Sequence, residues 1–326
     1  MRIALDFAGS DTGPEVFMEA VSIAVKQRPY LRFLLLVPTN SYFQIPSGLS
    51  LSVEKCLAEE VVEMWDSPVL ALREKPKATL FLGLDALKNS LVEACISTGN
   101  TGAIVAGAHR LLPLFRGIKR VSLLANSPLT PTPLTLIDAG ASLLCRVSHL
   151  MQFAELGVLY QKIRFGVIQP KVGLLNIGQE AEKGPIELKK AYQMLSWMHE
   201  QKKIIFYGNV EANQVFDGRV NVLVTPGFSG NLFLKTAEGV LHVLRPHLLA
   251  SSLSSSTLNL QHFTDPAQIS IFLEQGVGSG LVMGLKSLLL KCHGRSTVEA
   301  ILHAIEEAYL LFEKNLTQKM CEACWK

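Results

Sequence analysis

The chain has 326 residues, a length that fits one large α/β domain or two smaller ones, and its 48% hydrophobic and 18% charged residues exclude a disordered chain. Its 31 Lys and Arg residues against 28 Asp and Glu residues give a formal net charge of +3. Because a nucleic-acid-binding domain is usually strongly basic, this balance argues against a nucleic-acid partner.

The hydrophobic content raises the question of a membrane protein. No uncharged apolar run reaches the roughly 20 residues that a spanning helix needs, and the nearest candidates, residues 121–137 and 246–264, are broken by prolines or diluted by serines. Residues 1–6 enter a strand pattern at once, which predicts that no signal peptide precedes the fold. The six cysteines are mostly scattered, as is usual for reduced thiols. We therefore expect a cytoplasmic protein.

Short apolar runs alternate with helical patterns along the chain. Runs without polar alternation indicate strands that are covered on both faces, and helices between them favour a mainly parallel sheet. The predicted strands occupy residues 2–6, 31–37, 94–97, 134–138, 172–176, 203–207 and 221–225. A last helix is predicted over residues 298–312, with Ser296 and Glu299 as its capping box. No linker divides the chain, so we expect a single domain over residues 1–326.

Glycine-bearing turns follow several of the predicted strands. In open α/β sheets, ligands bind beyond the carboxyl ends of the strands, and a helix N-terminus there attracts phosphate or an oxyanion. No dinucleotide fingerprint follows the first strand, and residues 280–287 have the wrong spacing for a P-loop. Residues 227–231 complete only the first half of a nucleophile elbow, so an acyl-enzyme on serine is not expected.

Neither a metal site nor a cofactor is predicted. Cys321 and Cys324 form a lone pair near the end of the sequence, whereas a structural zinc site needs four ligands. His242 and His247 flank an arginine and a proline, and we interpret them as surface or packing residues.

Blocks of residues spread from end to end resemble a known family. Residues 97–103 (STGNTGA) are similar to its SAGNTGA, and residues 172–184 (VGLLNIGQEAEKG) follow its VGLLNIGxExxKG. The other blocks are LDFAGSDTGP at 5–14, DSPVLALREK at 66–75, GNVE at 208–211, GFSGNLFLKTAEG at 227–239 and HGRS at 293–296. In this order they resemble the phosphate acyltransferase (PlsX) family of bacterial phospholipid synthesis.

The resemblance implies an activity and a fold. Family members convert an acyl–acyl-carrier-protein and inorganic phosphate into an acyl phosphate, which a glycerol-3-phosphate acyltransferase then uses. The implied fold has three α/β/α layers around a mainly parallel sheet, is similar to isocitrate dehydrogenase and phosphotransacetylase, and carries protruding helices. The implied assembly is a homodimer in peripheral contact with the membrane, and residues 240–263 are the candidate element for membrane or partner contact.

The chemistry that the family performs suggests roles for individual residues. Phosphate is already an anionic nucleophile, so an enzyme must align it with the thioester and stabilise the oxyanion. Lys183 is the candidate for the phosphate or oxyanion charge, and Asn231 is the candidate hydrogen-bond donor. The expected phosphate cradle is Gly99, Asn100, Thr101 and Gly102. Further substrate-binding candidates are Asp6, Asn209, Lys235 and His293. The plainer interpretations are a solvated lysine at Lys183 and a helix cap at Asn231.

Four positions depart from the family pattern: Ser10, Ser142, Pro185 and Pro226. Pro226 stands where the family has an aspartate, and a proline cannot take over the role of an acid. Two other functions stay open: a coenzyme A-dependent enzyme similar to phosphate acetyltransferase, and a non-catalytic membrane scaffold. Retention of Lys183, Asn231 and the glycine turns favours an active but divergent acyltransferase.

Overall fold

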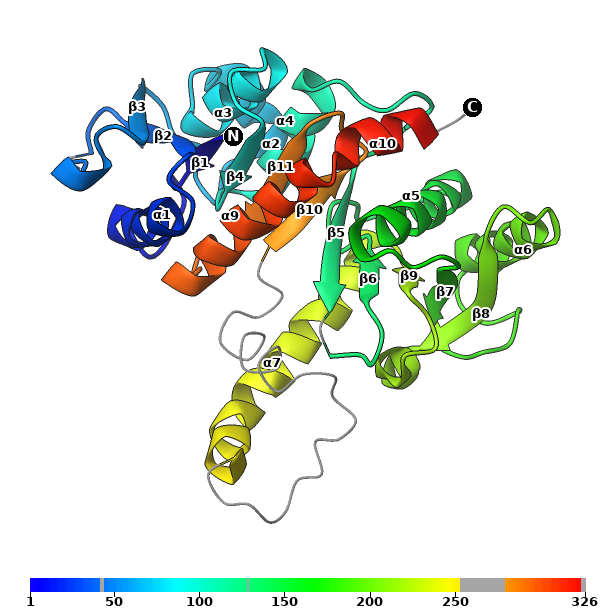
Figure 1. Ribbon diagram of the computed structural model, residues 1–326. Coiled ribbons are helices and arrows are strands. Elements are labelled where there is room, and N and C mark those ends of the chain that lie inside the picture. The colour runs from blue at the N-terminus through cyan, green and yellow to red at the C-terminus, as the bar shows by residue number, and fades with distance from the viewer. Residues whose placement is uncertain (42–43, 128, 253–278, 324–326) are drawn as a thin grey trace. The chain divides into compact units, whose positions relative to one another are not determined.

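The computed structural model describes residues 1–41, 44–127, 129–252 and 279–323. Contacts within the chain divide it into two compact units, Met1–Val121 with Gly278–Lys326, and Ser122–Val277 (Figure 1). Each unit is a sheet covered by helices, in agreement with the α/β class predicted from the sequence. The expectation of one continuous domain stays a prediction.

The sheet of the first unit is mainly parallel. Its order is β3 (Val53–Ala58), β2 (Arg32–Pro38), β1 (Arg2–Asp6), β4 (Ala94–Ser97), β11 (Leu288–Cys292) and β10 (Ser279–Met283). Only the pairing of β10 with β11 is antiparallel in this part of the described chain. Ile3, Leu5 and Leu35 are fully buried, as expected for strands that are covered on both faces.

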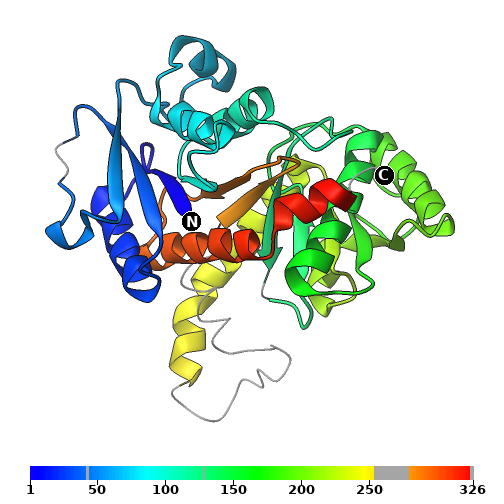
Figure 2. The ribbon, with the colours of Figure 1, turned by 45° about the horizontal axis from the view of Figure 1, so that its top comes forward.

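Helices cover both faces of this sheet. Figure 2 shows the cyan helices α3 (Thr79–Lys88) and α4 (Thr101–Leu111) above the strands, and the blue α1 (Pro14–Gln27) and orange-red α9 (Val298–Glu313) below them. The short helix α2 (Pro68–Glu74) packs on α4, and α10 (Leu316–Ala323) follows α9. The N-cap of α9 is Thr297, whose hydroxyl accepts a hydrogen bond from the Ala300 amide at 3.3 Å. The predicted capping box at Ser296 was therefore wrong by one residue.

The second unit repeats this arrangement with other elements. Its sheet order is β5 (Ser122–Ser127), β6 (Leu134–Ile137), β9 (Val222–Val224), β7 (Lys171–Asn176) and β8 (Ile205–Glu211). β5 runs antiparallel to β6, and the other neighbours are parallel. Its helices are α5 (Val147–Phe165), α6 (Ile186–Glu200) and α7 (Gly227–Ser252), with short 3-10 turns such as η2 (Ala212–Asp217).

The helices α5 and α7 lie on opposite faces of β6. Gln161 of α5 donates a hydrogen bond to the Thr135 hydroxyl at 2.8 Å. Leu134 and Leu136, which alternate with Thr135 along β6, line a pocket together with Phe233 of α7. Since successive side chains of a strand point to opposite faces, the two helices cover the two sides of the sheet.

Two sequence features that suggested other roles have structural explanations. The glycine-rich run 280–287, which superficially resembles a P-loop, is strand β10 and the turn into β11, where Gly284 has φ +106°. Residues 240–252 form the last turns of α7, and Val240 and Val243 are exposed there. The rest of the predicted membrane or dimer element, residues 253–263, lies outside the described residues. No helix in the described part of the chain is both long and apolar enough to cross a bilayer.

Candidate functional site

The carboxyl ends of β1, β4 and β11 lie next to one another in the first unit, because these strands are parallel neighbours. The loops that follow the strands contain the predicted residues Asp6, 99–102 and His293. Two backbone hydrogen bonds join these loops: the Thr98 amide donates to the Asp6 carbonyl at 3.1 Å, and the Asp11 amide donates to the Gly294 carbonyl at 2.8 Å. The structure therefore brings these candidates together at one edge of the sheet.

Asp6 is a buried carboxyl beneath the turn that follows β4. Its side chain is almost inaccessible to solvent, and its Oδ2 accepts a hydrogen bond from the Ser97 hydroxyl at 2.6 Å. A Cβ built on Gly99 would lie 3.6 Å from that oxygen, so the carboxyl lies directly beneath the turn. Burial raises the pKa of Asp6 to about 6, although the hydrogen bond from Ser97 opposes the shift. Asp6 thus supports the turn from below.

Asn100 is committed to local structure. Its Oδ1 accepts the Ala103 amide at 3.1 Å, which makes it the N-cap of α4. Its Nδ2 donates to the carbonyl oxygens of Glu63, Met64 and Asp66 at 3.0–3.3 Å. An anion at this turn would therefore be bound by the first backbone N–H groups of α4, at Thr101 and Gly102, since a helix N-terminus leaves such groups without intrahelical partners.

His293 lies in the turn between β11 and α9. Its Nδ1 accepts the Arg295 amide at 3.2 Å, and its carbonyl oxygen accepts the Ser296 hydroxyl at 2.7 Å. These contacts shape the turn that meets the loop after β1. A direct role for His293 in substrate binding stays a prediction.

In the second unit, the loop between β7 and α6 carries Lys183. Asn176 donates from Nδ2 to the Lys183 carbonyl at 3.1 Å, and Asn209 at the end of β8 donates to the Glu180 carbonyl at 2.8 Å. Two buried asparagines on neighbouring parallel strands thus hold the loop at both of its ends. The Lys183 side chain is 47% exposed and lies 3.8 Å from Glu180. Its ammonium group is therefore accessible to an anionic ligand.

A second cluster in this unit surrounds the start of α7. Asn231 donates from Nδ2 to the Ala139 carbonyl at 3.1 Å, which ties the first turns of α7 to the loop after β6. Gly140 has φ +137°, and a Cβ on it would lie 2.8 Å from Asn231 Nδ2. A Cβ on Gly230 would collide with the Asp138 carbonyl oxygen. Only glycine permits this close approach of the helix to the loop.

Asp138 organises this loop and was missed as a candidate from the sequence. It is fully buried, and its Oδ1 accepts the backbone amides of Leu123, Gly140 and Ala141 at 2.8–3.0 Å. Its other oxygen faces the start of α7, since a Cβ on Gly227 would lie 2.7 Å from it. Burial raises the pKa of Asp138, and these hydrogen bonds oppose the shift. The available signal was an acidic residue that ends a buried strand immediately before a glycine turn.

Lys235 lies one helical turn after Asn231 on α7, so the two side chains share a helix face. It forms an exposed ion pair with Glu238 at 2.6 Å, and such a pair adds little to stability. The two prolines among the departures stand at helix starts: Pro185 is the N-cap of α6, and Pro226 directly precedes α7. Proline is tolerated there because the first N–H groups of a helix have no intrahelical partner to lose.

The candidate residues of the second unit all follow strands that end at the same edge. β6, β9, β7 and β8 are successive parallel neighbours, so Asp138, the start of α7, Asn176 and Asn209 lie along one carboxyl edge. This edge combines an accessible cation, amide donors and the N-termini of α6 and α7. Such a set can bind an anion and stabilise negative charge that develops on a reacting carbonyl.

Comparisons with known proteins agree along the whole chain. Residues 1–319 match a family model described as "Fatty acid synthesis protein". A phosphate acyltransferase of Staphylococcus aureus (strain Newman) is 31% identical over 328 residues, covering 99% of this chain and 98% of the relative.

Solved structures share the fold. A phosphotransacetylase from Streptococcus pyogenes aligns with a TM-score of 0.59 and 16% identity, covering 98% of this chain and 94% of its own. A branched-chain phosphotransacylase from Enterococcus faecalis V583 aligns with a TM-score of 0.57 and 12% identity, covering 96% and 99%. The predicted α/β fold of the phosphotransacetylase kind is confirmed.

The raised pKa of Asp6 predicts a pH dependence of stability. A carboxyl whose pKa is higher in the folded than in the unfolded state contributes stability that is fully present below its unfolded value of 3.8 and is lost as the pH rises through about 6. Asp6→Asn lacks this titration. We expect the free energy of unfolding of the variant, relative to the parent, to rise by about 3 kcal/mol between acidic and neutral pH. Urea unfolding at both pH values measures the difference, and a difference that does not change with pH would contradict the assignment.

Proposed function

The chain belongs to the fatty acid synthesis protein family and is an acyltransferase, and from this premise we propose that it makes an acyl phosphate from an acyl–acyl-carrier-protein and inorganic phosphate. The observation that carries the proposal is the 31% identity to a phosphate acyltransferase over 99% of the chain. The accessible Lys183 and the helix N-termini at the carboxyl edge of the second unit support it, because they suit an anionic substrate.

The proposed reaction is a direct displacement. An oxygen of hydrogen phosphate attacks the thioester carbonyl, and the carbonyl oxygen becomes an oxyanion as the C–O bond forms. Collapse of this intermediate breaks the C–S bond, and the thiolate of the carrier leaves and takes up the proton that the phosphate releases. No serine or cysteine nucleophile is required. The enzyme contributes binding, alignment and stabilisation of charge.

Residues of the second unit take distinct roles in this scheme. Lys183 neutralises the phosphate or the oxyanion, and its ammonium is free to do so because only Glu180 lies near it, at 3.8 Å. Asn231 can donate its second amide hydrogen to the substrate while the first bonds to Ala139. Asp138 and Asn209 are positioning residues, since both hold loops by hydrogen bonds to backbone groups.

The proposal extends to partners and location. An acyl phosphate is an activated acyl donor, so the product suits a glycerol-3-phosphate acyltransferase acting next in phospholipid synthesis. We propose a homodimer in the cytoplasm that contacts the membrane peripherally through the end of α7, where Val240 and Val243 are exposed.

The central test is a phosphate-dependent assay with purified protein. We expect acyl phosphate to form from an acyl–acyl-carrier-protein only when inorganic phosphate is present, and more slowly from the matching coenzyme A thioester. Mass spectrometry of the product and free-thiol release measure the two halves of the reaction. A higher rate with coenzyme A thioesters would indicate the alternative enzyme, and no phosphate-dependent loss of either thioester would favour the scaffold.

Two substitutions test the site. Lys183→Ala and Asn231→Ala should each lower the rate of acyl phosphate formation by about 100-fold, the typical cost of removing one donor to an oxyanion. Lys171→Ala and Asn213→Ala are matched controls: Lys171 is an exposed lysine at the opposite end of β7, and Asn213 is an exposed asparagine in η2. If folded Lys183→Ala and Asn231→Ala proteins keep the parental rate, the site assignment is wrong.

The membrane contact has its own signature. Residues 246–264 contain no Lys or Arg, so apolar insertion rather than attraction to anionic lipid should dominate. We expect weak flotation with phosphatidylglycerol vesicles that is largely unchanged between about 0.1 M and about 0.5 M salt. Val243→Glu should reduce flotation, whereas Thr236→Glu should not. Loss of binding in moderate salt would contradict this account.

A further inference from the structure

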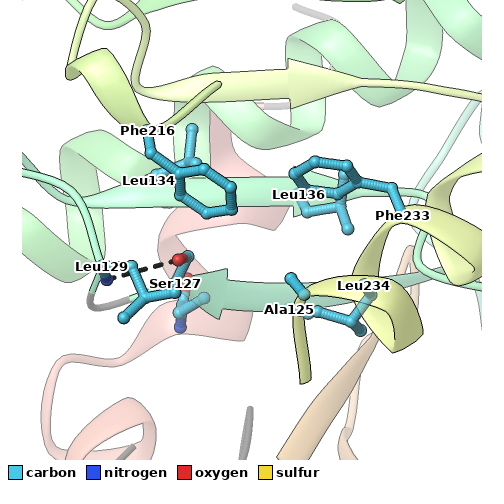
Figure 3. Close-up of a pocket in the computed structure, with 10 residues that line it drawn as sticks. Ala125, Ser127, Leu129, Leu134, Leu136, Phe216, Phe233 and Leu234 are labelled. Atoms are coloured by element: carbon cyan, nitrogen blue, oxygen red, sulfur yellow. Dashed lines mark hydrogen bonds between the residues drawn. The ribbon is translucent and has the colours of Figure 1, made fainter. Parts of the chain in front are cut away.

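A narrow apolar pocket lies between α7 and the sheet of the second unit (Figure 3). It encloses about 330 Å³ of space free of protein atoms, part of it open to solvent. Its walls come from β5, β6, η2 and α7. The residues that define it are Ala125, Leu134, Leu136, Phe216, Phe233 and Ala237. No charged side chain is among the residues that line it.

One end of this pocket lies beside the candidate site. Figure 3 shows Leu136 and Phe233 at one end, and Leu134, Phe216 and Leu129 at the other. Leu136 precedes the buried Asp138 by two residues on β6, and Phe233 follows Asn231 by two residues on α7. The pocket therefore begins under the loop and helix start that carry Asn231, and it leads away from them along α7.

We propose that this pocket holds the alkyl chain of the acyl group while its carbonyl reacts at Asn231 and Lys183, an inference that rests on the proposed function. An acyl group needs an apolar site next to a polar reaction centre, because its chain gains by leaving water while its carbonyl needs hydrogen-bond donors. The pocket supplies the first and the start of α7 supplies the second.

The two phenylalanines act as an adjustable wall. Phe216 and Phe233 stack with ring centroids 5.6 Å apart and an interplanar angle of 22°. Both side chains are only partly buried, so rotation of Phe216 toward solvent widens the pocket without opening the core. A chain longer than the pocket continues along the same stripe of α7, past Ala237 to the exposed Val240 and Leu244, which follow at helical spacing.

This arrangement predicts that a bulky residue at Ala237 shortens the chain that the enzyme accepts. Ala237→Trp should leave kcat/KM for a four-carbon acyl thioester within about twofold of the parent. It should lower kcat/KM for a sixteen-carbon thioester at least tenfold, which is about 1.4 kcal/mol of lost transition-state binding. Thr236→Trp is the matched control, because it adds the same side chain at the neighbouring, solvent-exposed position of α7.

A binding measurement separates chain binding from catalysis. Dodecyl phosphate is an unreactive mimic of a long-chain acyl phosphate, and calorimetry should show that the parent and Thr236→Trp bind it at least tenfold more tightly than Ala237→Trp does. Binding of inorganic phosphate should not differ among the three. Phe216→Ala should retain folding and bind dodecyl phosphate at least as tightly as the parent, because it enlarges the pocket.

The outcomes distinguish this inference from the proposed function. If the parent transfers acyl groups of every length and Ala237→Trp lowers all rates equally or none, the pocket does not hold the chain, although the proposed function stands. If the parent shows no phosphate-dependent transfer, the proposed function fails. In that case, loss of dodecyl phosphate binding in Ala237→Trp alone would still identify the pocket as an alkyl-chain site, and unchanged binding would overturn it.

Discussion

Parallel pairing of strands is the constraint on which the rest of this structure depends. Strands that run in the same direction end at the same edge, so residues far apart in the sequence become neighbours there. In the second unit this alignment places Asp138, Asn176, Asn209 and the start of α7 along one edge. In the first unit it does the same for Asp6, the turn at 98–102 and His293.

Each unit places a buried carboxyl at the end of a parallel strand. Asp6 accepts a hydroxyl hydrogen bond, and Asp138 accepts three backbone amides. Burial raises the pKa of both groups, which means that ionising them inside the protein costs free energy. Carboxyls retained in spite of this cost, next to glycine turns, indicate that the precise shape of these turns matters more than local stability.

The hydrophobic character of the chain is divided between two uses. Most apolar residues fill the space between the sheets and their helices, as the fully buried Ile3, Leu5 and Val222 illustrate. A smaller set lines the pocket along α7 and continues to Val240 and Val243 at the surface. For a protein that we propose to handle fatty acyl chains beside a membrane, this smaller set connects the fold to its substrate.

The sequence by itself determined the α/β class, most of the parallel strands, the helix over 298–312 and the family, because apolar periodicity and ordered motifs are local signals. It missed β3, β5, β10 and β11, whose alternation or glycine content obscured them, and it placed the cap of the last helix one residue early. It also could not rank Asp138 above other acids or show that Asn100 is committed as a cap. Those outcomes, and the pocket under Phe216 and Phe233, were decided by the tertiary structure, because burial and hydrogen-bond partners arise only when distant segments pack together.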